Sequence, residues 1–250
     1  MTALLEGRTA LVTGAAGRLG RRIVANLAAG GASVAAVDLA VAEGAVAIRA
    51  DVSVEADVER AVAEAEAALG PVDCLVNCAG FVPNRPLLEM EVDEWDKVFA
   101  VNVRGTMLTS RALARRWVER GTKGSIVNLS SIAAHSARAG GSHYCSSKAA
   151  VNMLTHVFAV ELGPHGIRVN AVAPGLVVDE VLTEATVDTN PYVAAMLAAT
   201  PLGRTGSPDE VADTIAFLLS DRSRYTTGAI IDVTGGIHCG RTHMPLSGAM

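Results

Sequence analysis

The sequence predicts an α/β fold, a doubly wound parallel sheet with helices on both faces. Short apolar runs alternate with amphipathic stretches along most of the 250 residues, which is the rhythm of strand-helix-strand units. The apolar runs are nonpolar at consecutive positions, as strands covered by helices on both faces must be. Half of the residues are hydrophobic, so the chain is long and apolar enough to bury a sizeable core.

Six strands and five helices follow from these patterns. The strands are residues 9–13, 33–38, 45–49, 73–77, 125–129 and 167–172, each an apolar run of strand length. The helices are residues 18–29, 58–69, 92–118, 145–162 and 208–220. In the second helix, apolar residues repeat at helical spacing between a Ser53 cap and the pair Gly70–Pro71, which is typical of a helix end.

The chain shows no internal repeat, no low-complexity tract and no linker rich in Pro, Gly or Ser, which predicts a single domain over residues 1–250. Two irregular stretches remain. We expect residues 176–207 to form a substrate loop, because long excursions at the carboxyl ends of parallel strands often cover a site; a disordered loop is the alternative. The tail, residues 237–250, is expected to fray, unless it folds over the cleft or reaches a neighbouring subunit.

Charge and hydropathy narrow the partners. The net charge is -5 and the pI is about 5.7, so no basic field is available to collect nucleic acid or an anionic membrane surface. No apolar run approaches the ~20 residues of a membrane helix, and the N-terminus has no basic, leader-like segment. The expectation is a cytoplasmic protein that acts on a small molecule.

The cysteines and histidines do not suggest a metal site. The four cysteines show no C-x-x-C spacing, which favours free, buried thiols in a reducing compartment. The six histidines form no H-E-x-x-H motif and no tight cluster with acidic residues in the sequence. We therefore expect no metal.

A glycine-rich turn directly follows the first predicted strand and opens a helix. It contains Gly14, Gly17, Arg18, Leu19 and Gly20. Glycines there let the backbone turn sharply and approach a pyrophosphate, whose charge is stabilised by free amides and the positive end of the helix dipole. This strand-turn-helix context indicates a dinucleotide site.

Asp38 ends the second predicted strand, where a carboxylate can accept both ribose hydroxyls of an adenosine. The same carboxylate would repel a 2′-phosphate, so NAD is favoured. Arg18 points the other way, because a guanidinium beside the adenosine could pair with that phosphate, and NADP stays open.

A second constellation combines Tyr144 and Lys148 with Ser131, which follows an apolar strand. Tyr144 and Lys148 are four residues apart and therefore share one helix face. A tyrosine with a pKa of about 10 transfers protons poorly at pH 7, and lowering that pKa by ~3 units requires roughly 4 kcal/mol in favour of the phenolate. One positive charge at ~4 Å supplies about that much at an intermediate dielectric, so a lysine is the partner this chemistry needs.

Taken together, these motifs resemble the short-chain dehydrogenase/reductase family, from Leu5 to about Gly236. Further segments support the resemblance: the run containing Asn77, Ala79 and Gly80, the pair Asp51 and Val52, Asn102, the pair Pro174 and Gly175, and the segment from Asp232 to Gly236. The resemblance implies a Rossmann-type sheet of about seven strands and an oxidoreductase that passes hydride between a secondary alcohol and its ketone. Relatives are mostly tetramers or dimers built from the helices that correspond to 92–118 and 145–162, which implies a homotetramer or homodimer here.

The resemblance also implies roles for individual residues. Tyr144 would be the general acid/base, Ser131 would hydrogen-bond the reacting oxygen, and Lys148 would hold the nicotinamide ribose and depress the tyrosine pKa. Asn102 would hold a water in the proton relay. Asn77 would steady the central sheet within a cofactor-binding segment, Asp51 and Val52 would touch the adenine, and Pro174 and Gly175 would lie beneath the nicotinamide.

Three features depart from the family pattern. The glycine spacing is T-G-x-x-G-x-x-G, and only twelve residues separate Asp38 from Asp51, so the helix after the second strand is expected to shrink to a turn. Asp179 stands where most members carry a threonine that binds the carboxamide, and either the Val177 backbone or Thr183 would replace it.

The substrate is less defined. His135 and Arg138 fall on the rim of the substrate cleft by resemblance and could meet an anionic or hydroxylated substrate. The alternatives are an NADPH-dependent 3-oxoacyl reductase, a cyclic dihydrodiol dehydrogenase and a non-catalytic, NAD-sensing member of the fold. A serine hydrolase using Ser131 and His135 is disfavoured because there is no G-x-S-x-G elbow.

Overall fold

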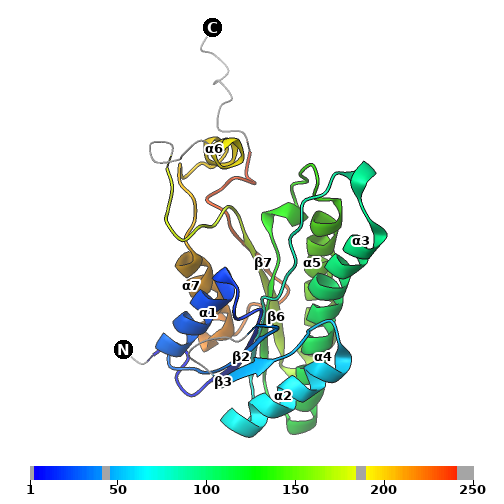
Figure 1. Cartoon of the computed structure of the whole chain (residues 1–250). Coiled ribbons are helices and arrows are strands. Elements are labelled where there is room, and N and C mark those ends of the chain that lie inside the picture. The colour runs from blue at the N-terminus through cyan, green and yellow to red at the C-terminus, as the bar shows by residue number, and fades with distance from the viewer. Residues whose placement is uncertain (1–2, 41–45, 184–189, 241–250) are drawn as a thin grey trace.

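Seven parallel strands form one twisted sheet in the computed structural model, which describes residues 3–40, 46–183 and 190–240 (Figure 1). The spatial order is β3-β2-β1-β4-β5-β6-β7, which confirms the doubly wound prediction. The chain reverses direction across the sheet after β3, and the site forms at that switch point. The strands are β1 Thr9–Thr13, β2 Ser33–Asp38, β3 Val46–Arg49, β4 Cys74–Asn77, β5 Ser125–Leu129, β6 Arg168–Pro174 and β7 Ile230–Val233.

Helices cover both faces of the sheet. On one face lie α1 (Arg18–Ala29) and α7 (Pro208–Leu219), and on the other lie α2 (Glu55–Leu69), α4 (Thr106–Arg120) and α5 (Ser142–Leu162) (Figure 1). Consecutive strand residues point to opposite faces of the sheet. Val12 packs in the core beneath α1 and α7, whereas Leu11 packs in the core beneath α2 and α4. This is why the strands are apolar at consecutive positions.

The ends of α2 confirm one prediction and correct another. Gly70 ends the helix with a positive φ of 81°, as the Gly-Pro signal predicted. Ser53 is not the cap: Val54 occupies that position without a side-chain hydrogen bond, and the Ser53 hydroxyl donates to Asp51 Oδ1 instead. The carboxylate of Asp51 competes for the hydroxyl that would otherwise cap the helix.

The predicted helix over 92–118 is interrupted. The structure has α3 (Val92–Phe99), a π-helical segment η2 (Ala100–Gly105) and then α4. The side chain of Asn102 is bonded to the backbone N–H and C=O of Phe81, which accompanies the wide turn at this point. The next helix, α5, begins at Ser142 rather than at residue 145.

Helix α6 (Pro191–Ala198) lies inside the stretch 176–207 that the sequence left irregular. Its start is well defined, since the Asn190 side chain accepts hydrogen bonds from the backbone N–H groups of Tyr192 and Val193 and Pro191 occupies the first turn. Short single-turn helices complete the described chain at Leu87–Glu89, Ile132–Ala134, Gly163–His165 and Asp221–Ser223.

Several predictions fall wholly or partly outside the described residues. The shortened connection after Asp38 includes residues 41–45, the substrate-loop prediction includes residues 184–189, and the tail prediction includes residues 241–250. Within the described chain, no helix is long and apolar enough to cross a membrane. The four cysteines are free, but only Cys74 is buried; Cys78 and Cys145 are half-buried and Cys239 is exposed, so the prediction of buried thiols is wrong for Cys239 and holds fully only for Cys74.

Candidate functional site

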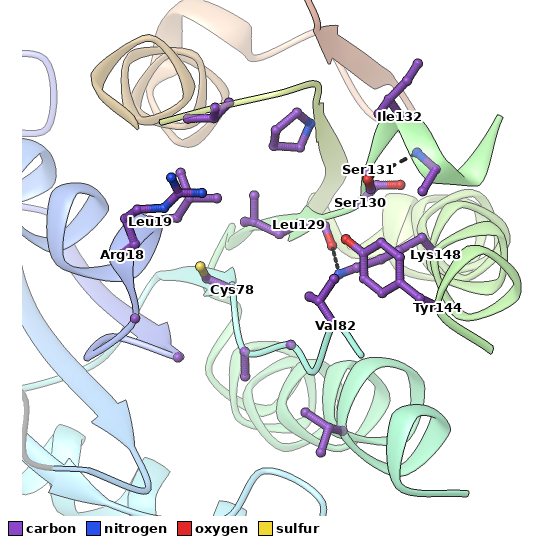
Figure 2. A pocket seen from close by; sticks show the side chains of 18 of the residues that line it. Arg18, Leu19, Cys78, Val82, Leu129, Ser130, Ser131, Ile132, Tyr144 and Lys148 are labelled. Carbon is purple, nitrogen blue, oxygen red and sulfur yellow. Dashed lines mark hydrogen bonds between the residues drawn. The ribbon is translucent and has the colours of Figure 1, made fainter. Parts of the chain in front are cut away.

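A cavity of about 860 Å³ opens at the carboxyl ends of the central strands (Figure 2). Most of the residues that the sequence predicted for the cofactor and the chemistry line it. They are Gly14, Gly17, Arg18, Leu19, Gly20, Asp38, Asp51, Val52, Ala79, Gly80, Ser131, Arg138, Tyr144, Lys148, Pro174, Gly175 and Val177. Three predicted residues, Asn77, Asn102 and His135, are not part of its lining.

The glycine-rich turn leaves backbone where side chains would not fit. Gly14 has a positive φ of 67°, and a Cβ there would lie 2.6 Å from the Cα of Ala79. A Cβ on Gly20 would lie 2.0 Å from the carbonyl oxygen of Gly14. Thr13 connects this turn to the loop that follows the neighbouring strand β4, because its Oγ1 accepts the N–H groups of Cys78 and Ala79 at 3.2 Å. The glycines therefore permit a tight turn at the N-terminus of α1, a kind of backbone that a pyrophosphate can approach.

Asp38 holds the far side of the same turn. Its Oδ2 accepts the backbone N–H of Ala16 at 2.9 Å, and its Oδ1 accepts that of Ala40 at 3.0 Å. Both oxygens keep lone pairs, so the carboxylate can still accept ribose hydroxyls from the cavity. Arg18, the first residue of α1, lines the same end of the cavity.

Asp51 and Val52 close that end. Asp51 Oδ1 accepts the N–H and the hydroxyl of Ser53, which fixes the turn after β3. Val52 packs against Gly105 so closely that a Cβ on Gly105 would lie 2.8 Å from its Cγ2. This end of the cavity is thus formed by Arg18, Asp38, Asp51 and Val52, from the segments at the ends of β1, β2 and β3.

The chemical groups lie at the opposite end of the cavity. Tyr144, in the first turn of α5, faces Ser131, which follows β5, and Lys148 lies on the next turn of α5 beside the tyrosine ring (Figure 2). The Lys148 Nζ is 5.8 Å from the centroid of that ring and donates to the backbone oxygen of Leu129 at 2.7 Å. The three predicted groups therefore converge on one wall.

Burial changes the acidity of both groups. It lowers the pKa of Lys148 to about 8. It raises the pKa of the Tyr144 phenol above its usual value of 10, against the opposing effects of Ser131 and the Arg138 guanidinium. The lowered tyrosine pKa expected from Lys148 is thus not a property of the protein alone and stays a prediction for the protein with its cofactor.

The two predicted asparagines lie beneath the cavity. Asn77 donates to Ser110 Oγ and to Asn128 Oδ1, both at 2.9 Å, so its amide joins β4 to α4 and β5. Asn102 is 1% exposed, and its amide is bonded to the Phe81 backbone and to Ser147 Oγ. Asn77 is therefore placed to support the sheet rather than to touch a cofactor, and the water-holding role of Asn102 stays a prediction.

Pro174 is the last residue of β6 and Gly175 follows it, and both line the cavity. Gly175 is tightly packed, since a Cβ there would lie 2.9 Å from the Cα of Thr234. Val177 lines the cavity, whereas Thr183 pairs with Arg204 in an isolated antiparallel bridge and is not part of the lining. Of the two alternatives for the carboxamide contact, the placement favours Val177.

The two rim residues separate. Arg138 lines the cavity, with its guanidinium carbon 5.7 Å from the centroid of the Tyr144 ring. His135 is exposed, and its Nε2 lies 3.7 Å from Asp232 Oδ1. The other carboxylate oxygen, Asp232 Oδ2, lies 3.3 Å from His238 Nε2.

Within residues 3–40, 46–183 and 190–240, no group of His, Cys, Asp and Glu has an arrangement that could hold a metal ion.

Other residues in the cavity lining, or in contact with it, were missed from the sequence. Tyr192 and Met196, one helical turn apart on α6, line the cavity, and the Asn190–Pro191 start of that helix was the available signal. His143 is fully buried; its Nδ1 accepts the N–H of Tyr144 at 2.9 Å, and its Nε2 lies 3.4 Å from Glu94 Oε1. No local pattern signals this contact, because Glu94 comes from a different helix.

Comparison with known proteins gives consistent matches. Residues 14–238 match the family model described as enoyl-(acyl carrier protein) reductase. The chain is 41% identical to the (3R)-3-hydroxyacyl-CoA dehydrogenase of Mus musculus and 45% identical to the L-xylulose reductase of Bos taurus, in each case over 93% of this chain and 97% of the relative.

Solved structures of similar sequence have the same fold as this chain. A short-chain type dehydrogenase/reductase from Mycobacterium marinum is 34% identical with a TM-score of 0.85, covering 94% of this chain and 97% of that one. A gluconate 5-dehydrogenase from Burkholderia cenocepacia, in complex with NADP and tartrate, is 31% identical with a TM-score of 0.83 over the same shares of the two chains.

Proposed function

The chain belongs to the short-chain dehydrogenase/reductase family, and we propose that it transfers hydride between a secondary alcohol and a nicotinamide dinucleotide, with Tyr144 as general acid/base. The observation that carries the proposal is the convergence of Ser131, Tyr144 and Lys148 on one wall of a cavity whose other end is a glycine cradle. The two curated relatives described above are named for reactions at a secondary alcohol or its ketone, which supports this reaction class.

The dinucleotide fits the residues that would hold it. A Cβ on Gly14 or Gly20 would collide with neighbouring backbone, so glycines are needed for the tight turn at the N-terminus of α1, where free amides suit a pyrophosphate. Asp38 would accept the ribose hydroxyls at the adenosine end, and Lys148 would hold the ribose at the other end. When bound, the nicotinamide would accept or supply the hydride.

The proton chemistry falls to the chain's own side chains. Tyr144 takes the hydroxyl proton during alcohol oxidation and returns it during ketone reduction. Ser131 donates a hydrogen bond to the reacting oxygen and fixes its position beside the phenol. Lys148, protonated at neutral pH because its pKa is about 8, provides the positive charge that favours the phenolate.

NAD is the proposed cofactor. The Asp38 carboxylate, held against the glycine turn by the Ala16 and Ala40 amides, would face a 2′-phosphate with a negative charge. NADP is the competing choice, supported by Arg18 at the same end of the cavity. A tenfold or larger preference for NADP in kcat/KM would overturn the assignment.

The stretch 176–207 is proposed as the substrate loop. Leu176, Val177, Tyr192 and Met196 from this stretch line the cavity. A salt bridge between Arg204 Nη2 and Glu210 Oε1, at 2.6 Å, anchors the C-terminal end of this stretch to α7. The Leu176, Tyr192 and Met196 side chains would contact the substrate, whereas the Val177 backbone would contact the carboxamide of the dinucleotide.

We also propose that the chain assembles as a homodimer or homotetramer through α4 and α5. Val118 on α4 and Met153, Val157 and Val160 on α5 are exposed apolar side chains on these two helices. A second copy of the chain would cover them. Light scattering of the wild type and of Val160→Glu tests this, with a smaller assembly expected for the variant; a wild-type monomer would refute it.

The test of the function is a spectrophotometric screen. Secondary alcohols, cyclic diols and 3-oxo thioesters are assayed against NAD(H) and NADP(H), with the change in reduced nicotinamide as the readout. We expect turnover of at least one secondary alcohol or ketone. Measurable dinucleotide binding without any turnover would favour the non-catalytic alternative instead. Ester hydrolysis that disappears in Ser131→Ala would favour the hydrolase.

A further inference from the structure

Arg138 brings a positive charge to the chemical end of the cavity without an acidic partner. Its Nη1 donates to the neutral Asn84 Oδ1 at 2.8 Å, and among the described residues no carboxylate lies within ion-pair distance of it. The guanidinium has five N–H donors, and this contact uses one. The remaining donors are available to a ligand in the cavity.

The carboxylates of the cavity lie elsewhere. Of the described lining residues, only Asp38 and Asp51 are acidic; Asp38 ends β2 and Asp51 lies just after β3, at one edge of the sheet. Arg138 follows β5, on the other side of the switch point. The substrate half of the cavity therefore carries net positive charge from Arg138 and Lys148, which favours an anionic ligand.

Two contacts position Arg138 in the absence of a ligand. Its carbonyl accepts the N–H of Gly141 in a tight turn, and Asn84 holds its guanidinium from the loop after β4. Its guanidinium carbon lies 5.7 Å from the centroid of the Tyr144 ring, close enough to pull the pKa of that phenol downward. A group bound to Arg138 would thus lie only a few bonds from a carbon that reacts beside Tyr144.

Apolar side chains line the same cavity, among them Val82, Ile132, Met196 and Ile237, beside the polar Asn84, Ser136 and Tyr192. The apolar side chains can accommodate a short hydrocarbon chain, and Arg138 supplies a charge that can orient it.

We propose that Arg138 binds a carboxylate of the substrate, so that the preferred substrates are small hydroxy acids and oxo acids with the anionic group a few bonds from the reacting carbon. The inference rests on the proposed function and specifies its substrate class. A guanidinium recognises a carboxylate with two parallel hydrogen bonds, which also fixes the orientation of the reacting carbon. The phosphates of a coenzyme A thioester lie too far from its reacting carbon to use this site.

The experiment compares matched pairs that differ only in charge. Wild type, Arg138→Gln, Arg138→Lys and the surface control Arg224→Gln are assayed with 2-hydroxybutyrate and 3-hydroxybutyrate and with the methyl ester of each. 3-Hydroxybutyryl coenzyme A is a further arm. Dissociation constants of each acid and ester are measured on the protein saturated with NADH, so that binding is read even where turnover is slow.

The ratio of acid to ester isolates the charge recognition. Loss of Arg138 also removes its effect on Tyr144, but that effect is common to both members of a pair and cancels in the ratio. For the wild-type enzyme, we expect at least one acid to exceed its methyl ester about tenfold or more in kcat/KM or in affinity. Arg138→Gln should reduce this acid-to-ester ratio to near one, and Arg138→Lys should partly restore it. Arg224→Gln should leave the ratio unchanged.

The outcomes separate this inference from the proposed function. Turnover of the esters or the thioester as efficient as that of the acids would overturn the carboxylate site while leaving the dehydrogenase intact. Equal losses on acid and ester in Arg138→Gln would likewise overturn it, because they would indicate an effect through Tyr144 alone. Absence of any nicotinamide-dependent turnover would count against the function, and the binding ratio would still decide the carboxylate site.

Discussion

Lys148 carries a buried positive charge that weakens the fold. It is 4% exposed, its Nζ donates to the Leu129 carbonyl at 2.7 Å, and burial lowers its pKa from 10.5 to about 8. We predict that Lys148→Met makes the nucleotide-free protein more stable at pH 7, although the variant loses a group that the proposed reaction needs. A gain in stability together with a loss of activity is typical of substitutions in a functional site.

The magnitude follows from the two pKa values. Because the folded pKa is below the unfolded one, the penalty is fully present below pH 8 and fades as the pH rises toward 10.5. At about 1.4 kcal/mol per pKa unit the penalty is about 3 kcal/mol, and losing the bond to Leu129 returns about 1 kcal/mol. The expected net gain at pH 7 is about 2 kcal/mol, and it should largely vanish by pH 10.

Urea unfolding of the nucleotide-free wild type and Lys148→Met at pH 7 and pH 10 tests this. Lys123→Met is the matched control, because Lys123 is exposed and its ammonium stays in water. Its stability relative to wild type should not change between the two pH values. A stability difference for Lys148→Met that is the same at both pH values, or a wild type that is the more stable protein at pH 7, would refute the reasoning.

Three further predictions concern the cofactor end and the substrate loop. Asp38→Ser should lower the NAD-to-NADP ratio of kcat/KM at least about tenfold, since the charge opposing a 2′-phosphate is removed. Gly20→Ala should weaken NADH binding at least about tenfold in a fluorescence titration, because its Cβ would lie 2.0 Å from a backbone oxygen, whereas Gly163→Ala, with nothing within 4 Å, should not. Arg204 holds the pKa of Glu210 down to about 2, so this carboxyl stabilises the fold above pH ~4.5 and stops doing so as the pH falls toward 2. Arg204→Gln should therefore lower the thermal midpoint at pH 7 more than at pH 3.

Each of these has a contrary outcome. An unchanged cofactor ratio in Asp38→Ser would show that this carboxylate does not read the ribose. Gly20→Ala and Gly163→Ala binding NADH equally well would mean that the glycine turn is not the cradle. Equal losses of thermal stability at both pH values in Arg204→Gln would assign the effect to packing rather than to charge.

The sequence predicted those parts of the fold that depend on residues close together in the chain. Leu11 and Val12 face opposite layers, and this double coverage is what makes β1 apolar at consecutive positions. The glycine turn was accessible for a similar reason, since the collision at Gly20 involves Gly14 of the same turn. Ser131, Tyr144 and Lys148 line the cavity as expected, because the ends of parallel strands and the helix that follows meet at one edge of the sheet.

What the sequence did not predict depends on contacts between distant segments. Asn102 lies in a π-helical turn bonded to Phe81, and its motif does not reveal that its amide is already occupied. His143 meets Glu94 only because α3 packs against α5. Helix α6 lacks an amphipathic repeat, so its Asn190–Pro191 start was the only local sign of it, and that sign was missed.

The central claim is that one phenol moves the proton, and Tyr144→Phe tests it most directly. The substitution removes a single oxygen from a ring that Ser131 and Lys148 surround, so the cavity and the glycine cradle stay intact. With a substrate found in the screen, we predict that kcat falls by about 10²–10⁴ while the dissociation constant for the dinucleotide changes by less than about twofold. A variant that keeps full turnover would contradict the account.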